Sequence, residues 1–423
     1  MVENKKEFAN LNYEVHDIGY PYCPYLPIGA KPINKAVVTK TNVAPPPLAM
    51  PDSDLPRVLN YLADYSGCGY WRIGAPEMLL NYGGKLVINT LTSMVIDPRF
   101  YLTGYSAIKI QRQATPVQKE FAKFLKMMGN TLNTKVIYEV DDIVFGEDIP
   151  LYNRCRSAFT DPEIRQSIED IIHMCGEMMV VSDYMKEYYK NKLNIKNVTT
   201  IPNYAPKFWF DRFYNAEKTL KNYQENKKRP KILIAASGSH FDVINATGQK
   251  DDYSHVLQSI IKTRKDFQWI FMGGHPLLLK PFIDNGDIIF KPWAQLLQFS
   301  DAINEIAPQM TMAALENNHF NWAKSNIKLT ESCHLGIPFV GQDSPPYKDA
   351  FHKFNNGDEL IDQLKSIVVD EDIYMAESLK HRNFGDKLWL DDHLQEHLEM
   401  YTLPFGDQNR KAILKLNTEQ LIK

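Results

Sequence analysis

A lysine-flanked segment near residue 325 has the residue types that a diphosphate site needs. Ser325 and Asn326 are good N-cap residues, so a helix is predicted to begin there. The free backbone N–H groups of Ser325, Asn326 and Ile327, together with the positive end of the helix dipole, can hold an anion. Lys324 and Lys328 are four residues apart and add positive charge on the same side. The alternative is an ordinary capped helix that leads into a core strand.

A carboxylate further along the same predicted helix extends this site to a nucleoside. Glu331 lies one turn beyond the lysines, where its carboxylate could accept hydrogen bonds from two hydroxyls of a ribose. Gly336 is expected to end the helix, and residues 337–340 to begin the next buried strand. The segment therefore predicts a site for a nucleoside diphosphate.

Two glycine-containing turns in the second half of the chain could add backbone contacts to this site. One turn follows a predicted strand at 231–236, and a Gly-Ser pair there lets backbone approach a phosphate closely. The other ends a predicted strand at 269–272, at the edge where such sheets bind ligands. Either turn could also be a simple connection. The candidate residues in the two turns are Gly238, Ser239, His240, Gly273 and Gly274.

Charged residues also follow predicted strands in the first half of the chain. Asp141 and Asp142 end one strand, and carboxylates at that position of a parallel sheet point into a cleft. They could contact a ligand there, or they could cap a helix or lie in a solvated turn. Arg112 ends the preceding strand, and Lys119 and Lys123 fall on one side of the helix after it. These three cations could border an anionic acceptor, although such lysines also occur on solvated surfaces.

The elements that must position these residues alternate between strand and helix in both halves of the chain. This alternation indicates parallel sheets covered on both faces. The charged stretch between the halves is interpreted as an interdomain linker. The sequence predicts two doubly wound α/β domains over residues 1–205, with an irregular leader, and 231–385, joined by a linker at 206–230 and followed by a helical segment at 386–423 that crosses back to the first domain.

Composition limits the possible classes of protein. The 423 residues, 44% of them hydrophobic and 23% charged, suit two folded domains. The net charge of −3 argues against a strongly basic protein that coats nucleic acid, but allows a local basic groove. Five widely spaced cysteines without a CxxC pair predict no metal site and a reducing compartment. No apolar run is long enough to span a bilayer, so we expect a cytoplasmic protein without stable membrane insertion.

The segment at 320–338 resembles the donor site of retaining glycosyltransferases of the GT-B fold, which carry an E-x7-E motif. Glu331 matches the second glutamate, which binds the ribose of the nucleotide in that family. Ala323 stands where the first glutamate is expected, which is a departure from the pattern. A divergent subgroup with the motif FN..KS.IK..E...LGIP is the most similar, and it matches from Phe320 to Pro338.

The resemblance implies a GT-B enzyme whose two domains face each other across a donor cleft. The donor is expected to be a nucleotide-diphosphate sugar, UDP-linked, which is a substrate, and neither a cofactor nor a metal is implied. Lys324 and Lys328 would stabilise the leaving diphosphate, while Asp141 and Asp142, in a segment similar to the family's YE.DD, would border the sugar and the acceptor. The loop with Gly67, Gly69 and Arg72 would face the donor phosphates, unless it is a simple turn with an exposed arginine.

The acceptor is predicted from a further similarity to glycosyltransferases of tailed bacteriophages, some of which modify hydroxymethylated cytosine in DNA. The loop at 67–69 also resembles that of the phage DNA α-glucosyltransferase. We therefore expect double-stranded DNA with 5-hydroxymethylcytosine as the acceptor, its base flipped into the cleft of an enzyme in the host cytoplasm. Arg112, Lys119 and Lys123 would bind its phosphates. The alternatives are a surface-polysaccharide or protein glycosyltransferase, and a catalytically degenerate GT-B binding module.

Overall fold

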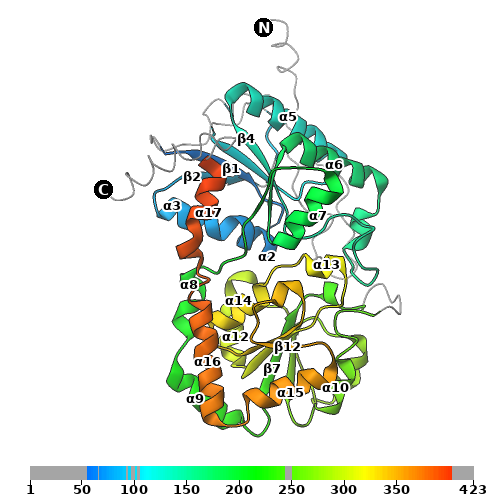
Figure 1. Ribbon diagram of the computed structural model, residues 1–423, viewed down its shortest axis with the longest axis vertical. Helices are drawn as coiled ribbons and strands as arrows, with labels where there is room; N and C mark the ends of the chain where they lie inside the picture. The colour runs from blue at the N-terminus through cyan, green and yellow to red at the C-terminus, as the bar shows by residue number, and fades with distance from the viewer. Residues whose placement is uncertain are drawn as a thin grey trace, which may run out of the picture.

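The computed structural model describes residues 55–64, 66–91, 94–96, 101, 105–242 and 250–402, and the leader predicted at 1–50 lies outside them. Two α/β domains are stacked along the long axis of the molecule, each with a central sheet between helices (Figure 1). The prediction of two doubly wound α/β domains is confirmed. No helix in these described ranges combines the length and the apolar character needed to cross a membrane.

The first domain is built on a six-stranded sheet whose order is β2-β1-β3-β4-β5-β6. Every neighbouring pair in it is parallel. The strand order reverses between β1 and β3, and ligands of such folds bind outside the carboxyl ends of the strands at a reversal of this kind. The strands are β1 (Arg57–Tyr61), β2 (Val87–Leu91), β3 (Ala107–Gln111), β4 (Lys135–Glu139), β5 (Glu177–Val180) and β6 (Val198–Thr200).

Helices with clear end signals cover this sheet. The longest, α5 (Pro116–Leu132), begins with a capping box between Thr115 and Gln118 and ends at Asn133 in the left-handed conformation. Its apolar side, which includes Phe121 and Leu125, is buried in the domain core. The other helices are α2 (Gly67–Gly69), α3 (Ala75–Tyr82), α6 (Pro162–Cys175) and α7 (Asp183–Leu193), with a π-helical turn η1 (Tyr70–Gly74) before α3.

The second domain repeats the doubly wound plan with the strand order β12-β11-β10-β7-β8-β9. All neighbouring strands are parallel, and the order reverses between β7 and β10. The strands are β7 (Lys231–Ala236), β8 (Gln268–Gly273), β9 (Ile289–Lys291), β10 (Met310–Ala313), β11 (Phe339–Gln342) and β12 (His352–Phe354). The helices are α10 (Leu257–Lys262), α11 (Lys280–Asp284), α12 (Phe299–Ile306), α13 (His319–Trp322), α14 (Ile327–His334), α15 (Gly357–Ile367) and α16 (Glu371–Gly385).

The stretch interpreted as a charged linker is largely helical. It contains α8 (Lys207–Phe210) and α9 (Ala216–Asn226), and the side chain of Asn215 caps α9. Tyr223 of α9 is buried and stacks on Tyr374 of α16, with ring centroids 4.6 Å apart. One buried aromatic ring therefore docks an otherwise charged helix on the second domain, a contact that the composition of the segment did not reveal.

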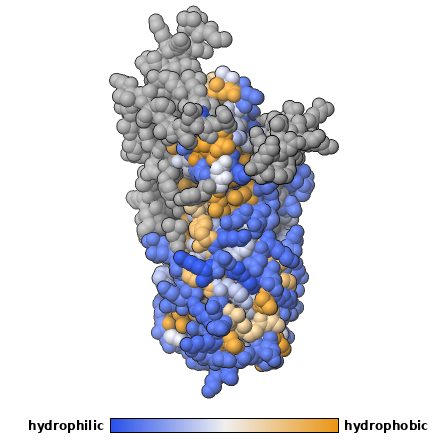
Figure 2. All heavy atoms as spheres, turned by 90° about the vertical axis from the view of Figure 1, so that its left-hand side faces the viewer, coloured by the Kyte–Doolittle hydropathy of each residue, from blue (hydrophilic) through white to orange (hydrophobic). Residues whose placement is uncertain are grey.

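The last described helix, α17 (Leu390–Thr402), returns to the first domain. It lies beside α3 (Figure 1), and its residues Leu398, Met400 and Tyr401 share a core cluster with Val58 of β1. Figure 2 views the side of the molecule on which α9, α16 and α17 lie, and there the second domain is mostly hydrophilic with small apolar patches. On this side α9 and α16 present a largely solvated face, while α17 packs on the first domain.

Candidate functional site

The carboxyl ends of the two sheets face each other, and loops from both meet there. Asp142 follows β4 in the first domain, and Lys324 follows α13 in the second. Lys324 Nζ lies 3.3 Å from Asp142 Oδ1 and 4.4 Å from the centre of the Phe320 ring. Burial disfavours the charged amine, but Asp142 and Asp252 outweigh it and raise the pKa of Lys324 above its ordinary value. Two predicted site residues from opposite domains thus form a charged pair in the cleft.

The segment around Lys324 is fixed against the first domain by its neighbours. Phe320 and Ala323 are buried in the core cluster of that domain. Ser182 Oγ donates a hydrogen bond of 2.8 Å to the carbonyl of Ala323, and Asn203 Nδ2 donates one of 3.2 Å to Ser325 Oγ. Ala323, which stands where the resemblance expects a glutamate, is therefore buried where the two domains pack together.

The helix predicted near Ser325 begins at Ile327, with Asn326 as its N-cap. The Asn326 side chain makes no capping hydrogen bond, and residues 325–328 are all partly exposed. The first turn of α14 is therefore partly open to solvent, although Ile327 packs against a neighbouring core cluster. Backbone donors and a positive dipole end at such a position are available to an anion.

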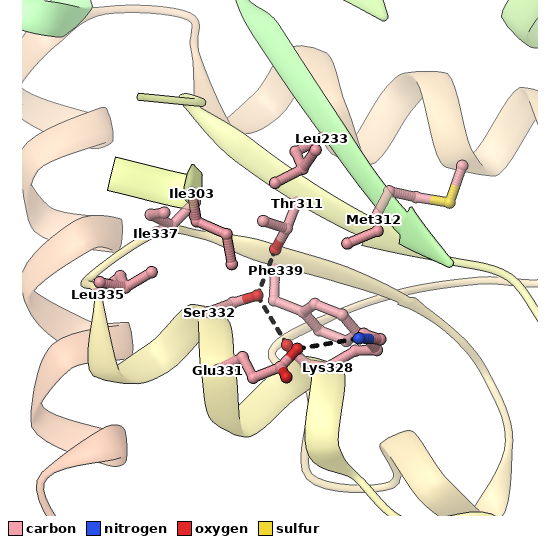
Figure 3. Close-up of a pocket in the computed structure, with 11 residues that line it drawn as sticks. Leu233, Ile303, Thr311, Met312, Lys328, Glu331, Ser332, Leu335, Ile337 and Phe339 are labelled. Atoms are coloured by element: carbon pink, nitrogen blue, oxygen red, sulfur yellow. Dashed lines mark hydrogen bonds and ion pairs between the residues drawn. The ribbon is translucent and has the colours of Figure 1, made fainter. Parts of the chain in front are cut away.

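Glu331 lies one turn into α14 and is almost fully buried. Its Oε2 lies 3.0 Å from Lys328 Nζ, and both residues line a cavity of about 20 Å³ under the helix (Figure 3). Burial raises the pKa of Glu331 above its ordinary value, although Lys328 opposes the shift. A cavity of this size holds about one water molecule. A pentose would therefore have to bind at its solvent side, where Ala235 and Lys328 are partly exposed.

The two glycine turns of the second domain pack against each other. A Cβ atom on Gly273, whose φ is +98°, would lie 2.1 Å from the Trp293 ring. A Cβ atom on Gly274 would lie 3.1 Å from the backbone nitrogen of Gly238. Trp293 in turn lies under Lys328, whose Nζ is 5.9 Å from the ring centre. The glycines thus allow the turns after β7 and β8 to approach the lysine-flanked end of α14.

The short 3-10 turn η4 (Gly238–His240) follows β7 at the point where the strand order reverses. Ser239 Oγ lies 3.9 Å from Cys155 Sγ of the first domain, so the turn borders the cleft. His240 Nδ1 lies 2.7 Å from Asp252 Oδ2. Asp252 was not predicted from the sequence, because nothing in an Asp-Asp pair before a helix distinguishes a buried carboxylate from an exposed one.

Arg72 does not face the cleft, contrary to its predicted role at the donor phosphates. It is 1% exposed, and its Nε lies 2.7 Å from Glu139 Oε1. Its terminal nitrogens donate to Asn203 Oδ1 and to the carbonyls of Val180 and Ile201. The guanidinium ties β4 and β5 to the segment after β6, which leaves it no face for a diphosphate. Both predicted roles, donor binding and an exposed turn residue, are therefore wrong.

The loop that carries Gly67 and Gly69 is hydrogen-bonded to Asp64, which follows β1. Asp64 Oδ1 accepts hydrogen bonds from the backbone of Ser66 at 2.7 Å and of Gly69 at 3.3 Å. A Cβ atom on Gly69 would lie 1.9 Å from the Asp64 carbonyl oxygen, so only glycine fits there, whereas nothing lies within 4 Å of that position at Gly67. Close packing therefore requires glycine at position 69, whereas a side chain would fit at position 67.

The predicted acceptor-side cations are all paired with carboxylates. Arg112, which has a φ of +46°, forms an ion pair with Asp64 and lies 3.5 Å from Asp141 Oδ1. On α5, Lys119 lies 3.4 Å from Asp170, and Lys123 is paired with the neighbouring Glu120. The structure brings Arg112 and Asp141 together. Lys119 and Lys123 line neither the cavity under α14 nor the larger interdomain cavity described next.

A second, more open cavity of about 450 Å³ lies between the domains. Its walls come from residues 147–152 and Arg156 of the first domain, and from Lys250, Glu316 and Asn318 of the second. The charged residues are three carboxylates and two cations, the carboxylates being Glu147, Asp148 and Glu316. The cavity is large enough for a small polar ligand and has no excess of positive charge.

Comparisons with known proteins find similarity in structure only. No family model and no curated protein matches the sequence. Anabaena Alr3699/HepE, solved with UDP and glucose, has a TM-score of 0.54 at 8% identity, over 82% of this chain and 98% of that one. An α-glucosyltransferase solved with UDP and DNA containing an HMU base has a TM-score of 0.51 at 10% identity, over 82% and 99% of the two chains.

The chain spans 54% of the length of TarM, with 70% of its own residues aligned at 9% identity and a TM-score of 0.48. The other two structures align along nearly their whole length, with TM-scores of 0.54 and 0.51. The two doubly wound domains and these similarities together show that the chain has the GT-B fold.

Proposed function

We propose that this protein is a glycosyltransferase that takes a sugar from a UDP-linked donor bound at the start of α14. One observation carries the proposal: a partly exposed helix N-terminus with a lysine on each side lies opposite a carboxylate of the other domain in a GT-B fold. The two most similar structures named above were solved with UDP, which supports uridine as the base.

The residues at the start of α14 suit the charge that develops in sugar transfer. When the bond between the anomeric carbon and the diphosphate breaks, negative charge grows on the leaving group and positive charge grows on the sugar. Lys324, Lys328 and the amides of residues 325–327 would stabilise the diphosphate without a metal. Glu331 would accept hydrogen bonds from the ribose hydroxyls at the solvent side of its cavity.

Asp142 is assigned the contact to the transferred sugar. Ala323 is fully buried and its carbonyl accepts from Ser182, so a side chain at that position has no path into the cleft. Asp142 is partly exposed and approaches the same segment from the other domain. With Asp142 in this role, the stereochemical outcome is proposed to be retention, as in the resembling enzymes.

Modified DNA is the acceptor proposed first, and its support is the fold shared with an α-glucosyltransferase solved on DNA with an HMU base. A second acceptor class is favoured by the interdomain cavity of about 450 Å³. Its three carboxylates would accept hydrogen bonds from hydroxyls, but would repel the phosphates of nucleic acid. A sugar or polysaccharide acceptor therefore suits that cavity better than DNA does.

A donor panel followed by an acceptor assay tests this proposal. UDP-, GDP- and dTDP-sugars are first compared by thermal shift, and a UDP-sugar is expected to raise the melting temperature most. The best donor is then incubated with plain DNA, with DNA that contains 5-hydroxymethylcytosine, and with an oligosaccharide. A mass gain on one acceptor identifies its class. If no nucleotide sugar is hydrolysed or transferred, the proposed activity is wrong, and a donor that binds without turnover would support the binding module instead.

A further inference from the structure

Three aromatic side chains from the two domains meet at the domain boundary. Tyr184 lies at the start of α7 in the first domain, and His319 and Trp322 lie on α13 in the second, where the two helices are neighbours (Figure 1). The ring centroid of Tyr184 is 6.2 Å from that of His319 and 5.8 Å from that of Trp322, and the last two are 4.7 Å apart. A hydrogen bond joins Tyr184 Oη and His319 Nδ1. These three residues form a rim cluster that contains rings of both domains.

The rim cluster keeps contact with solvent. His319 is exposed, and Tyr184 and Trp322 are only partly buried. Trp322 Nε1 donates a hydrogen bond of 2.8 Å to Asn317 Oδ1, which fixes the orientation of the indole ring. Aromatic rings that are packed on one side and wet on the other are typical of binding surfaces. The cluster therefore offers aromatic surface of fixed orientation to a ligand.

The rim cluster adjoins the interdomain cavity of about 450 Å³. Asn318, the residue before His319, lines that cavity together with Asp148 and Glu316. Burial and the negative charge of Asp148 both raise the pKa of Tyr184, so this carboxylate also lies close to the cluster. The cavity and the aromatic rings are therefore parts of one surface that both domains build.

The carboxylates of this surface keep hydrogen-bond acceptors for a ligand. Asp148 Oδ2 accepts from Tyr188 Oη and from Lys192 Nζ, both at 2.5 Å. Glu316 Oε2 accepts from Asn318 Nδ2 at 2.6 Å. The other oxygens, Asp148 Oδ1 and Glu316 Oε1, have no hydrogen-bond partner among the residues described. Burial raises the pKa of Asp148, but the bonds from Lys192 and Tyr188 outweigh burial and hold this pKa below its ordinary value, so the group is ionised and only accepts.

A neutral oligosaccharide has the chemistry that fits such a surface. One face of a pyranose ring consists of C–H groups, which the electron-rich face of an aromatic ring attracts. The edge of the same ring carries hydroxyls, which donate to carboxylate oxygens. The bases of nucleic acid could also stack on these rings, but the three carboxylates in the adjoining cavity would repel the phosphates.

We propose that the rim cluster and the adjoining cavity bind a neutral oligosaccharide chain. In this site, sugar rings stack on the rim cluster and hydroxyls donate to Asp148 and Glu316. The inference rests on the proposed function, because it selects a glycan chain as the acceptor of the enzyme. A chain bound here contacts both domains, since Tyr184 belongs to the first domain and Trp322 to the second.

Isothermal titration of the full chain, without a donor, tests this site. The ligands are maltohexaose, laminarihexaose and N-acetylated chitohexaose, which are neutral, and a DNA duplex with 5-hydroxymethylcytosine. We expect at least one hexasaccharide to bind and the duplex not to compete with it. W322A and H319Q each remove one ring and should each weaken that binding by about tenfold, while Y184F keeps its ring and should stay within about twofold of the wild type. H319Q changes an exposed side chain, so its result does not depend on how well W322A folds.

F208A is the matched control, because Phe208 is an exposed aromatic residue of α8 that lines neither cavity. It should bind the hexasaccharide as the wild type does. The inference is wrong if no hexasaccharide binds, if W322A and H319Q both bind as the wild type does, or if the duplex competes, which would make DNA the ligand. Binding is measured without a donor, so a chain that binds a hexasaccharide but turns over no UDP-sugar overturns the proposed function instead.

Discussion

Replacing Lys328 with methionine is expected to lower kcat for transfer from a UDP-linked donor by about 100-fold. Lys328 Nζ lies at the first turn of α14, 3.0 Å from Glu331 and close to the Trp293 ring. The Lys328 charge would stabilise the departing diphosphate more strongly in the transition state than in the bound donor. Its loss should therefore lower kcat more than it raises KM. Steady-state kinetics with the donor selected by thermal shift measures both constants.

A matched substitution separates this effect from a general loss of charge. Lys365 on α15 is exposed and lines neither cavity, so K365M should keep wild-type kinetics. The K328M protein should remain folded, because methionine can follow the same path along the Trp293 and Phe299 rings. Wild-type kcat in folded K328M would contradict the assignment of the diphosphate to this helix end.

Replacing Arg72 with methionine is expected to lower the free energy of unfolding by about 3–5 kcal/mol, because it leaves a buried charge without its partner. Glu139 is fully buried, and Arg72 Nε is its ion-pair partner at 2.7 Å. The same substitution also removes the side-chain hydrogen bonds that Arg72 donates to the carbonyls of Val180 and Ile201. Urea unfolding monitored by circular dichroism measures the change.

Two further variants make this stability prediction specific. R212M removes an exposed pair with Asp301 and should change the free energy of unfolding by less than about 1 kcal/mol. The double variant R72M/E139M should recover part of the loss, because no unpaired buried charge remains. Under conditions where R72M is folded, its UDP affinity should match that of the wild type. A stable R72M protein that fails to bind UDP would contradict the assignment of Arg72 to the domain core alone.

The general architecture and the principal helix of the site could be predicted because they depend on local patterns. Alternating strands and helices indicated the two doubly wound sheets, and N-cap residues with flanking lysines indicated the start of α14. The carboxyl ends of parallel strands meet at one edge, so Asp142 could be placed at the cleft before its pairing with Lys324 was known.

The remaining features depend on contacts between distant residues. An arginine after a glycine loop looks the same in sequence whether it reaches a ligand or, like Arg72, bonds a carboxylate 67 positions away. Asp252 is likewise defined by Tyr152 and Asn321, which lie far from it in the chain. The burial of Tyr223 against Tyr374 is a third case, and it turns an apparent linker into a docked helix.

Calorimetric titration of UDP into the wild-type chain and into E331Q tests the account most directly. Glu331 is nearly buried beside Lys328, and a neutral amide would accept ribose hydroxyl hydrogen bonds more weakly than a carboxylate. The account predicts one UDP site per chain in the wild type and an affinity about tenfold lower in E331Q. Equal UDP affinity in the two proteins, or no heat of binding in the wild type, would contradict a nucleotide site at this helix.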